Sequence, residues 1–304
     1  MEKQVRIRVP ATSANCGPGF DTLGIACTLY NYATYTITST PGLELEVQGE
    51  GREALTADSH NLAIHSFYKG WNAATGGERV GLRLSMENNI PLSRGLGSSS
   101  SAIVAGLYAA NCLAGKVLSQ DRLLALATEI EGHPDNVAPA LYGGLTISYT
   151  AEGTPHSLRL LPAKPLKFIA VVPASPLSTS LARQAIPATV PHGDAVFNTA
   201  RASLLVGALL SGQYQYLAAG LEDRLHQPYR AKLIPGLEQV WEAARQQGAY
   251  NAIISGAGST VMAYAPLEAD HEAIGYAMQE AFARQGERSV FHILDLDEEG
   301  VQAL

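Results

Sequence analysis

The sequence predicts a chain of two domains, each of which mixes helices with strands. Its 304 residues, of which 46% are hydrophobic and 16% charged, can bury a substantial core in one large domain or two of ordinary size. Apolar residues alternate with polar ones in both halves, which predicts strands, and apolar residues at helical spacing predict helices between them. Turn-rich segments at residues 152–155 and 161–165 favour a domain boundary between these segments.

The individual elements follow from the same patterns, bounded by proline, glycine and capping residues. In the first half we expect a strand over 5–10, strands over 35–38 and 43–47 joined by a Pro41-Gly42 turn, a helix starting near Asp58 or Ser59, a helix after the serines at 98–101, a helix over 120–131 and a strand over 145–149. In the second half we expect a strand over 168–172, a helix over 195–210, helices around 217 and 240, strands over 252–255 and 260–264, a helix over 268–284 and a strand over 290–294.

Composition and charge exclude several classes of protein. A net charge of -7 without a cluster of lysines and arginines argues against a nucleic-acid partner. The three cysteines are odd in number and lack metal-ligand spacing, so we expect reduced thiols in a cytoplasmic protein. The N-terminus does not resemble a signal peptide, and the longest apolar run, residues 203–210, is too short for a bilayer, so we expect no membrane association.

The segment "PLSRGLGSSSS", residues 91–101, places Gly95 and Gly97 before four serines, between a strand-like and a helix-like stretch. Backbone N–H groups at such a helix start bind anions, and serine hydroxyls suit phosphate oxygens or Mg²⁺. The segment lacks the lysine of a Walker-type loop and the glycine spacing of a dinucleotide fingerprint. Taken alone, it is either a nucleotide phosphate site or a structural turn.

The segment "EIEGHPDNVAPALYGG", residues 129–144, gathers Glu131, His133, Asp135 and Asn136 around a helix break. It is either a ligand site, for a metal or a substrate amine, or a capped helix start that needs only Asp135 or Asn136. Two further glycine-rich segments, residues 9–26 and 254–264, follow or join predicted strands, where loops carry function. A hairpin explains the second of them equally well.

The order and spacing of these segments resemble those of the GHMP kinases, through Gly-Leu-Gly-Ser-Ser-Ser at 95–100, the Ala-Ser/Thr-rich N-terminal loop and Ser-Gly-Ala-Gly-Ser at 255–259. Within that superfamily the chain is most similar to the homoserine kinases, through residues 11–15 with 17–21, residues 133–140 and residues 178–183. The resemblance runs from residue 5 to about residue 265.

The resemblance implies an α+β two-domain GHMP-kinase fold, with an N-terminal mixed α/β nucleotide-binding domain at 1–155 and a C-terminal ferredoxin-like α+β sandwich domain at 156–304. It implies ATP- and Mg²⁺-dependent phosphorylation of the L-homoserine side-chain hydroxyl, giving O-phospho-L-homoserine for threonine biosynthesis. The alternatives are a GHMP kinase for another small alcohol and a non-catalytic nucleotide-binding sensor. A homodimer would be an ordinary assembly.

The resemblance also assigns roles to residues of this sequence. The expected ATP contacts are Asn61, Leu62, Pro91, Arg94, Gly95, Leu96, Gly97, Ser98, Ser99, Ser100 and Ser101. The expected Mg²⁺ ligands are Ser98 and Glu131, with Glu129 as the competitor of Glu131. The expected homoserine contacts are Asn15, Asp21, His133, Asp135, Thr179, Arg183, Arg230 and Gly256, and the expected catalytic residues are Asn136 and Arg183.

The charges among these residues suit an amino acid, because arginines pair with a carboxylate and aspartates with an ammonium. Arg183 and Arg230 are the two arginines, with Arg224 as the alternative to Arg230 and an ordinary ion pair as the alternative role for each. Asparagine accepts no proton at neutral pH, so Asn136 is no base. Direct proton transfer to the γ-phosphate is favoured over Asp135 as base, since phosphoryl transfer depends mainly on positioning and charge.

Overall fold

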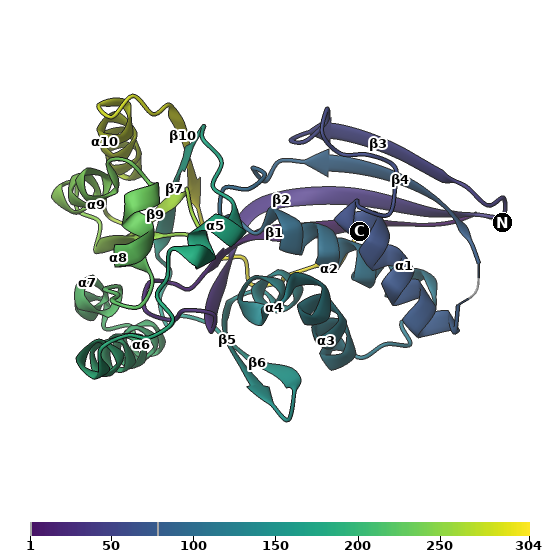
Figure 1. The fold of residues 1–304 in the computed structure, drawn as a ribbon, viewed down its shortest axis with the longest axis horizontal. Helices are drawn as coiled ribbons and strands as arrows, with labels where there is room; N and C mark the ends of the chain where they lie inside the picture. Colours follow the sequence, from purple (N-terminus) through teal and green to yellow (C-terminus); the bar gives the residue numbers. More distant parts are fainter. Residues whose placement is uncertain (1, 78) are drawn as a thin grey trace.

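The structure of the chain, a computed structural model, describes residues 2–77 and 79–304 as two halves that lie side by side (Figure 1). The strands are β1 (Lys3–Ala14), β2 (Leu23–Thr38), β3 (Leu43–Gly49), β4 (Gly81–Asn88), β5 (Leu145–Ala151), β6 (Thr154–Leu160), β7 (Lys167–Pro173), β8 (Asn251–Ile254), β9 (Val261–Ala265), β10 (Ser289–Leu294) and β11 (Gln302–Ala303). The helices are α1 (Leu62–Thr75), α2 (Ser98–Leu113), α3 (Gln120–Glu131), α4 (Pro134–Tyr142), α5 (Thr179–Gln184), α6 (His192–Ser211), α7 (Leu217–Gly220), α8 (Gln227–Arg230), α9 (Leu237–Gln246) and α10 (His271–Ala283), with short 3-10 turns at Tyr214–Tyr216 and Ala231–Leu233.

The first half is built on one mixed sheet covered by α1 to α4. Within the described residues its strands are ordered β11-β1-β2-β4-β3, and β5 pairs with the start of β2 and with β6. The core between helices and sheet includes a row of stacked rings, in which Phe67 lies 5.5 Å from Tyr35 and 6.0 Å from Trp71, measured between ring centroids. α2 packs in this core, and the loop that leads into its first turn bonds to the second half, where the N–H of Thr260 donates to the carbonyl of Arg94.

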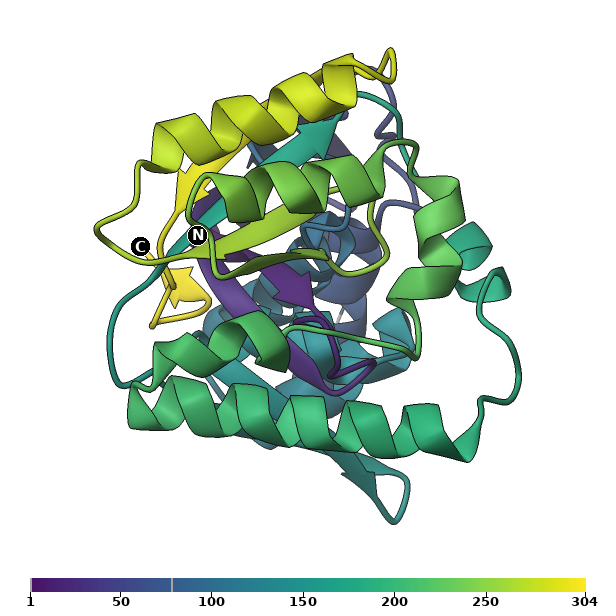
Figure 2. The same ribbon diagram turned by 90° about the vertical axis from the view of Figure 1, so that its left-hand side faces the viewer.

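The second half is an antiparallel sheet between two layers of helices. The described strands are ordered β10-β7-β9-β8. Along β7, Phe168 and Ala170 pack toward α6, α7 and the first half, while Ile169 and Val171 pack toward α9 and α10. Figure 2 shows α9 and α10 on one side of this sheet and α6 on the other. The period-two alternation of a strand therefore gives each face its own core.

One expectation about the first strands is wrong. The opening strand does not end at Pro10: the pairing of β1 with β2 shifts register between Pro10 and Ala11 and continues to Ala14, so a local bulge accommodates the proline. The strands expected on both sides of Pro41 and Gly42 are present, since β2 ends at Thr38 and β3 starts at Leu43. In the sheet β4 lies between these two strands and runs parallel to β3.

The start of α1 also differs from expectation. Neither Asp58 nor Ser59 caps the helix: Asn61 does, through its side-chain oxygen, which accepts a hydrogen bond from the N–H of Ala63 at 3.0 Å. The side chain of Asp58 instead accepts from the N–H of His60 at 2.7 Å, which closes a turn before the helix. The helix therefore begins two to three residues later than the sequence suggests.

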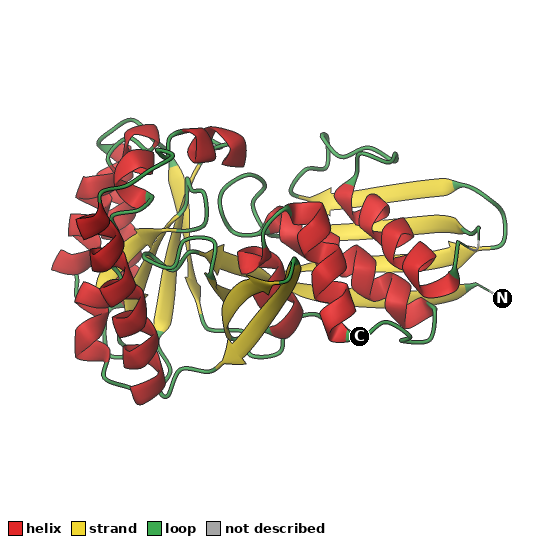
Figure 3. Cartoon of the chain, turned by 60° about the horizontal axis from the view of Figure 1, so that its bottom comes forward, coloured by secondary structure: helices red, strands yellow, loops and turns green. Residues whose placement is uncertain are grey.

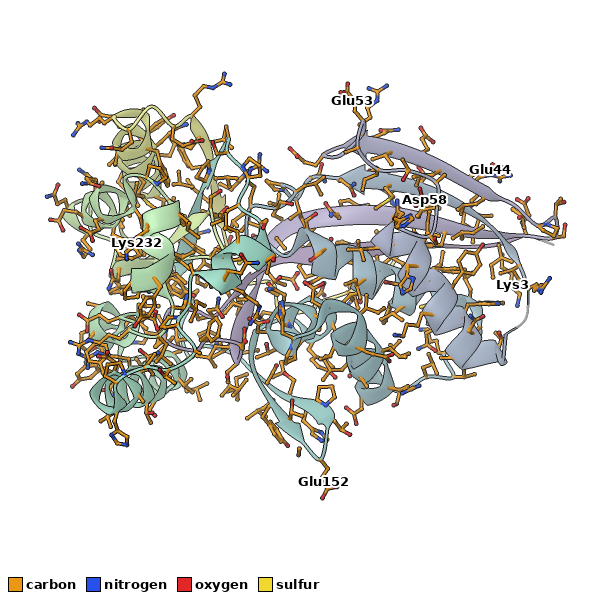
Figure 4. The ribbon with its side chains drawn as sticks, viewed as in Figure 1. Lys3, Glu44, Glu53, Asp58, Glu152 and Lys232 are labelled. Carbon is orange, nitrogen blue, oxygen red and sulfur yellow. The ribbon has the colours of Figure 1, made fainter. Side chains whose placement is uncertain are left out.

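The chain passes from the first sheet to the second after β6. This strand pairs with β5 as a hairpin that extends from the body of the molecule, with Glu152 at its tip (Figure 3; Figure 4). The expected boundary between residues 155 and 156 falls inside β6, and the terminal β11 returns to pair with β1. A division that follows the sheets would run through residues 161–166. In the described ranges no helix is long and apolar enough to cross a membrane.

Candidate active site

One cavity of about 370 Å³ lies between the two halves and collects most of the residues that the sequence singles out. The predicted residues that line it are Asn15, Asp21, Asn61, Leu62, Arg94, Gly95, Gly97, Ser98, Ser99, Glu131, His133, Asp135, Asn136, Thr179, Arg183, Arg230 and Gly256. The predicted residues that do not line it are Pro91, Leu96, Ser100 and Ser101. Leu96 is fully buried in the core below the loop, and Ser101 bonds to Asn31 at 2.9 Å. Residues far apart in the chain thus converge on one site.

The first turn of α2 has the features of an anion site. Its N-cap, Gly97, adopts the left-handed conformation and supplies no side-chain cap, so no cap side chain occupies the N–H groups of the first turn. Gly95 also has a positive φ, and a Cβ atom would clash with the carbonyl of Ser255 at Gly95 and with the hydroxyl of Thr12 at Gly97. Glycine is therefore required at both positions for conformation and for space.

Glu131 is the carboxylate that the structure places against the serine segment. Its Oε1 accepts hydrogen bonds from the hydroxyl of Ser99 at 2.8 Å and from that of Ser100 at 2.9 Å. Glu129, the competitor, points elsewhere and pairs with Lys69 at 2.8 Å outside the cavity lining. Among the described residues, no three or more His, Cys, Asp or Glu side chains are grouped so that they could hold a metal ion.

Another part of the cavity is lined by Asn61 and Leu62 with the apolar side chains of Leu55 and Met86. The side-chain amide of Asn61 is engaged by the backbone, since it caps α1 and donates to the carbonyl of Thr56 at 3.3 Å. No sequence signal marked Leu55 or Met86, because a loop leucine and an inward-facing strand methionine look like ordinary core residues.

An ion pair between Asp21 and Arg183 joins the two halves at the cavity. The guanidinium of Arg183, on α5, donates from Nη1 and Nη2 to the two oxygens of Asp21 at 2.9 and 2.8 Å. The hydrogen bond with Asp21 raises the pKa of Arg183 further, so the arginine stays charged. Arg183 thus forms an ion pair between the two halves, which was the alternative to substrate binding. It also lines the cavity, so the two roles are compatible.

Arg230 is the second arginine at the cavity, and it is almost fully buried. Its Nη1 donates to the carbonyl of Gly256 at 2.9 Å, and its Nε donates to the carbonyl of Ala182 at 3.3 Å. Burial, with the nearby charge of Arg183, lowers the pKa of Arg230 to about 10, which still leaves it protonated at neutral pH. Arg224, the alternative, pairs with Asp194 at 3.2 Å and does not line the cavity.

His133 and Asp135, at the start of α4, form a close pair in which Nδ1 of the ring lies 2.5 Å from Oδ1 of the carboxylate. Burial opposes the charge of the His133 ring, but the hydrogen bond and charge of Asp135, with the charge of Glu131, outweigh it and raise the pKa of His133. The next residue, Asn136, accepts a hydrogen bond at Oδ1 from the hydroxyl of Thr12 at 2.8 Å. Its remaining polar atom on the side chain, Nδ2, is a donor.

Several contacts hold the rest of the site. Asn15 donates from Nδ2 to the carbonyl of Gly256 at 2.9 Å and accepts at Oδ1 from the N–H of Asp21 at 3.0 Å, so it ties the N-terminal loop to the second half. The guanidinium of Arg94 donates to backbone carbonyl groups, from Nε to the oxygen of Pro173 at 3.0 Å and from Nη1 to the oxygen of Leu92 at 2.6 Å. The exposed side of Thr179 completes the lining at the start of α5.

Comparisons with known proteins agree with this architecture. Residues 61–144 match the family described as GHMP kinases N terminal domain, and residues 205–284 match GHMP kinases C terminal. The homoserine kinase of Desulfitobacterium hafniense is 42% identical over 302 residues, which cover 99% of this chain and 100% of that protein. The homoserine kinase of Carboxydothermus hydrogenoformans is 44% identical over 287 residues, which cover 93% of this chain and 91% of that protein.

A solved structure is similar along the whole chain as well. The crystal structure of the homoserine kinase from Cytophaga hutchinsonii superposes with a TM-score of 0.89 at 27% identity and covers 99% of this chain and 97% of that one. These findings confirm the two-domain GHMP-kinase fold expected from the motifs. The chain belongs to the homoserine kinase family of the GHMP kinases.

Proposed function

We propose that the chain transfers the γ-phosphoryl group of ATP to the side-chain hydroxyl of L-homoserine, giving O-phospho-L-homoserine, the precursor of threonine. The observation that carries the proposal is the shared cavity, which joins an uncapped helix start beside Glu131 to a pair of arginines and a pair of aspartates. An amino acid and a nucleotide triphosphate together need this combination of charges.

The phosphate groups of ATP fit the first turn of α2. The N–H groups that follow Gly97, and the hydroxyls of Ser98 and Ser99 that line the cavity, offer donors to phosphate oxygens. The base fits the part of the cavity lined by Leu62 and Met86, where apolar side chains can cover its faces.

The zwitterion of homoserine fits the opposite charges of the site. The guanidinium groups of Arg183 and Arg230 would bind its carboxylate, and Asp21 and Asp135 would attract its ammonium. An ammonium would give buried Asp135 a second positive partner beside His133, which a neutral sugar or a hydroxy acid cannot supply, and this favours the amino acid among alcohols of similar size.

In the chemical step the side-chain oxygen of homoserine forms a bond to the γ-phosphorus, the bond from that phosphorus to the bridging oxygen breaks, and ADP leaves. Because Thr12 occupies Oδ1 of Asn136, the amide would donate from Nδ2 to the attacking oxygen and orient its lone pair toward the phosphorus. Asparagine takes no proton, and Asp135 is engaged by His133. The hydroxyl proton therefore passes to an oxygen of the transferred phosphoryl group, as a loose transition state permits.

Mg²⁺ would be held by Glu131 and Ser98 together with phosphate oxygens, as is usual for an ion that takes few protein ligands in kinases. Glu131 fits because it lies beside the helix start that the phosphates would occupy, with Ser99 and Ser100 orienting its carboxylate. When bound, the ion would neutralise charge on the phosphate oxygens. A homodimer and a cytoplasmic location stay predictions.

The test is ADP release by the full chain with ATP, Mg²⁺ and one acceptor at a time: homoserine, mevalonate or galactose. We expect rapid release with homoserine alone, and a product whose phosphate is on the side-chain oxygen by phosphorus NMR. A preference for mevalonate or galactose would assign the site to another alcohol. ATP binding without release for any acceptor would indicate a sensor.

A further inference from the structure

His226 is a fully buried histidine that the sequence motifs did not single out as a site residue, and its ring contacts Arg230, which lines the cavity. It precedes α8 in the second half. Its Nε2 lies 2.8 Å from the carbonyl oxygen of Gly17, in the loop between β1 and β2, and its Nδ1 lies 3.1 Å from Nη1 of Arg230. One imidazole therefore bridges the two halves.

These two contacts determine the state of the ring. Arginine only donates hydrogen bonds, so Nδ1 of His226 accepts from Arg230, and a carbonyl only accepts, so Nε2 carries the proton and donates to Gly17. Burial lowers the pKa of His226, against the charge of Asp223, which keeps the ring neutral. A second proton on Nδ1 would face the N–H of Arg230.

The contact with His226 decides which donors Arg230 has left. Nη1 carries two N–H bonds, of which one points to the carbonyl of Gly256 at 2.9 Å and the other to His226. The Nε–H bond is taken by the carbonyl of Ala182. Within the described ranges no hydrogen bond involves Nη2, so the donors that this cavity residue can offer a carboxylate are those of Nη2.

The other nitrogen of His226 holds the N-terminal loop. Besides the bond to Gly17, the ring stacks on Phe20 with centroids 5.3 Å apart and planes at 28°. Two guanidinium groups also lie near the Phe20 ring, with Cζ of Arg230 at 5.3 Å and Cζ of Arg183 at 5.6 Å from its centroid. Asp21 directly follows Phe20, so the loop that His226 holds carries the carboxylate paired with Arg183.

We propose that His226 is a positioning residue for homoserine: through Nδ1 it directs Nη2 of Arg230 at the substrate carboxylate, and through Nε2 it sets the loop that carries Asp21. The inference rests on the proposed function, since it takes the carboxylate of homoserine as the ligand of Arg230. Nδ1 acts on the carboxylate end of the substrate through Arg230, and Nε2 acts on the ammonium end through the loop that carries Asp21. The side-chain amide of asparagine or glutamine can replace one of these nitrogens at a time.

The test uses two substitutions of matched polarity. In His226→Asn the amide oxygen reaches about as far as Nδ1, so it can still accept from Arg230, whereas the bond to Gly17 is lost. In His226→Gln the amide nitrogen reaches about as far as Nε2, so it can still donate to Gly17, whereas the bond to Arg230 is lost. Each variant is assayed with homoserine and with aminopropanol, the analogue that lacks the carboxylate.

We expect the preference for homoserine over aminopropanol, as a ratio of kcat/KM, to fall about 10- to 100-fold in His226→Gln, the range for one hydrogen bond to a charged group. In His226→Asn the preference should persist while KM rises for both acceptors. KM for ATP should stay unchanged in both variants. His271→Gln is the control, because this histidine also contacts a carbonyl, that of Pro266 at 2.9 Å, but lies outside the cavity.

Two results would overturn the inference. The first is a wild-type preference for homoserine in both folded variants, which would make His226 a packing residue. The second is an equal loss with every acceptor and a raised KM for ATP, alongside a lowered melting temperature, which would make its role purely structural. If the wild-type enzyme itself shows no turnover of homoserine, the proposed function fails, and the variants are not needed to show it.

Discussion

Replacing Arg183 with alanine separates what this residue does for the fold from what it does for the substrate. In the free protein its side chain is 38% exposed and that of Asp21 is 36% exposed. Solvent screens ion pairs at this exposure, so they typically contribute less than about 1 kcal/mol to stability. We therefore expect Arg183→Ala to lower the free energy of unfolding by less than about 1 kcal/mol, although the ion pair is bidentate.

The cost should be larger once homoserine occupies the cavity. The substrate would exclude water from both charges, and removing one member of a buried charge pair costs about 2–5 kcal/mol. By the relation between free energy and affinity this is a loss of about 30-fold or more in kcat/KM for homoserine. A small effect on unfolding with a large effect on substrate use is the expected signature of a binding arginine.

The assay compares kcat/KM for homoserine and for aminopropanol in the wild type and in Arg183→Ala, with Arg224→Ala as an arginine control outside the cavity. The preference for homoserine should fall in Arg183→Ala and stay at the wild-type value in Arg224→Ala. An equal preference in all three enzymes would show that Arg183 does not bind the carboxylate. A loss of kcat for every acceptor at unchanged KM would place it on the γ-phosphate instead.

Three further changes test other parts of the site. Glu131→Gln should reduce kcat severely, with partial rescue by excess Mg²⁺, whereas Glu129→Gln should be near wild type because that side chain pairs with a surface lysine; the reverse result would exchange their roles. Ser98→Ala should raise the requirement for ATP and Mg²⁺ and leave KM for homoserine nearly unchanged; a raised KM for homoserine alone would move Ser98 away from the phosphates. Because folding raises the pKa of His133, the protonated ring stabilises the fold. This stabilisation is fully present below about pH 6.5, the usual pKa of histidine, and is lost as the pH rises through the raised pKa. Urea unfolding from about pH 6 to about pH 9 should therefore show a larger loss in the wild type than in His133→Gln, and equal losses would contradict the charged pair with Asp135.

The parts of the site predicted from sequence are those in which local chemistry specifies the structure. Gly95 and Gly97 before a run of serines predicted the turn and the helix start, since both residues adopt the positive φ that favours glycine. The helix break at Gly132 and Pro134 likewise predicted where His133 and the start of α4 would lie. In each case the signal and the structure involve neighbouring residues.

The parts that sequence reasoning missed depend on contacts between distant residues or on weak patterns. The first part of β2, from Leu23 onward, is buried on both faces, so it lacks the alternation that marks a strand. The helix α5 is only six residues long, and its arginine meets Asp21 across 162 positions of the chain. His226 gave no signal, because a histidine acquires a role only from the groups that folding brings to its two nitrogens.

The most direct test of the account is a crystal structure with a non-hydrolysable ATP analogue, Mg²⁺ and homoserine. The account predicts phosphates at the first turn of α2, the homoserine carboxylate on Arg183 and on Nη2 of Arg230, and the hydroxyl oxygen beside Nδ2 of Asn136. That oxygen should lie about 3–3.5 Å from the γ-phosphorus and in line with the bond that breaks. Phosphates bound away from residues 95–100, or homoserine bound without contact to either arginine, would contradict the central claim that one cavity serves both substrates.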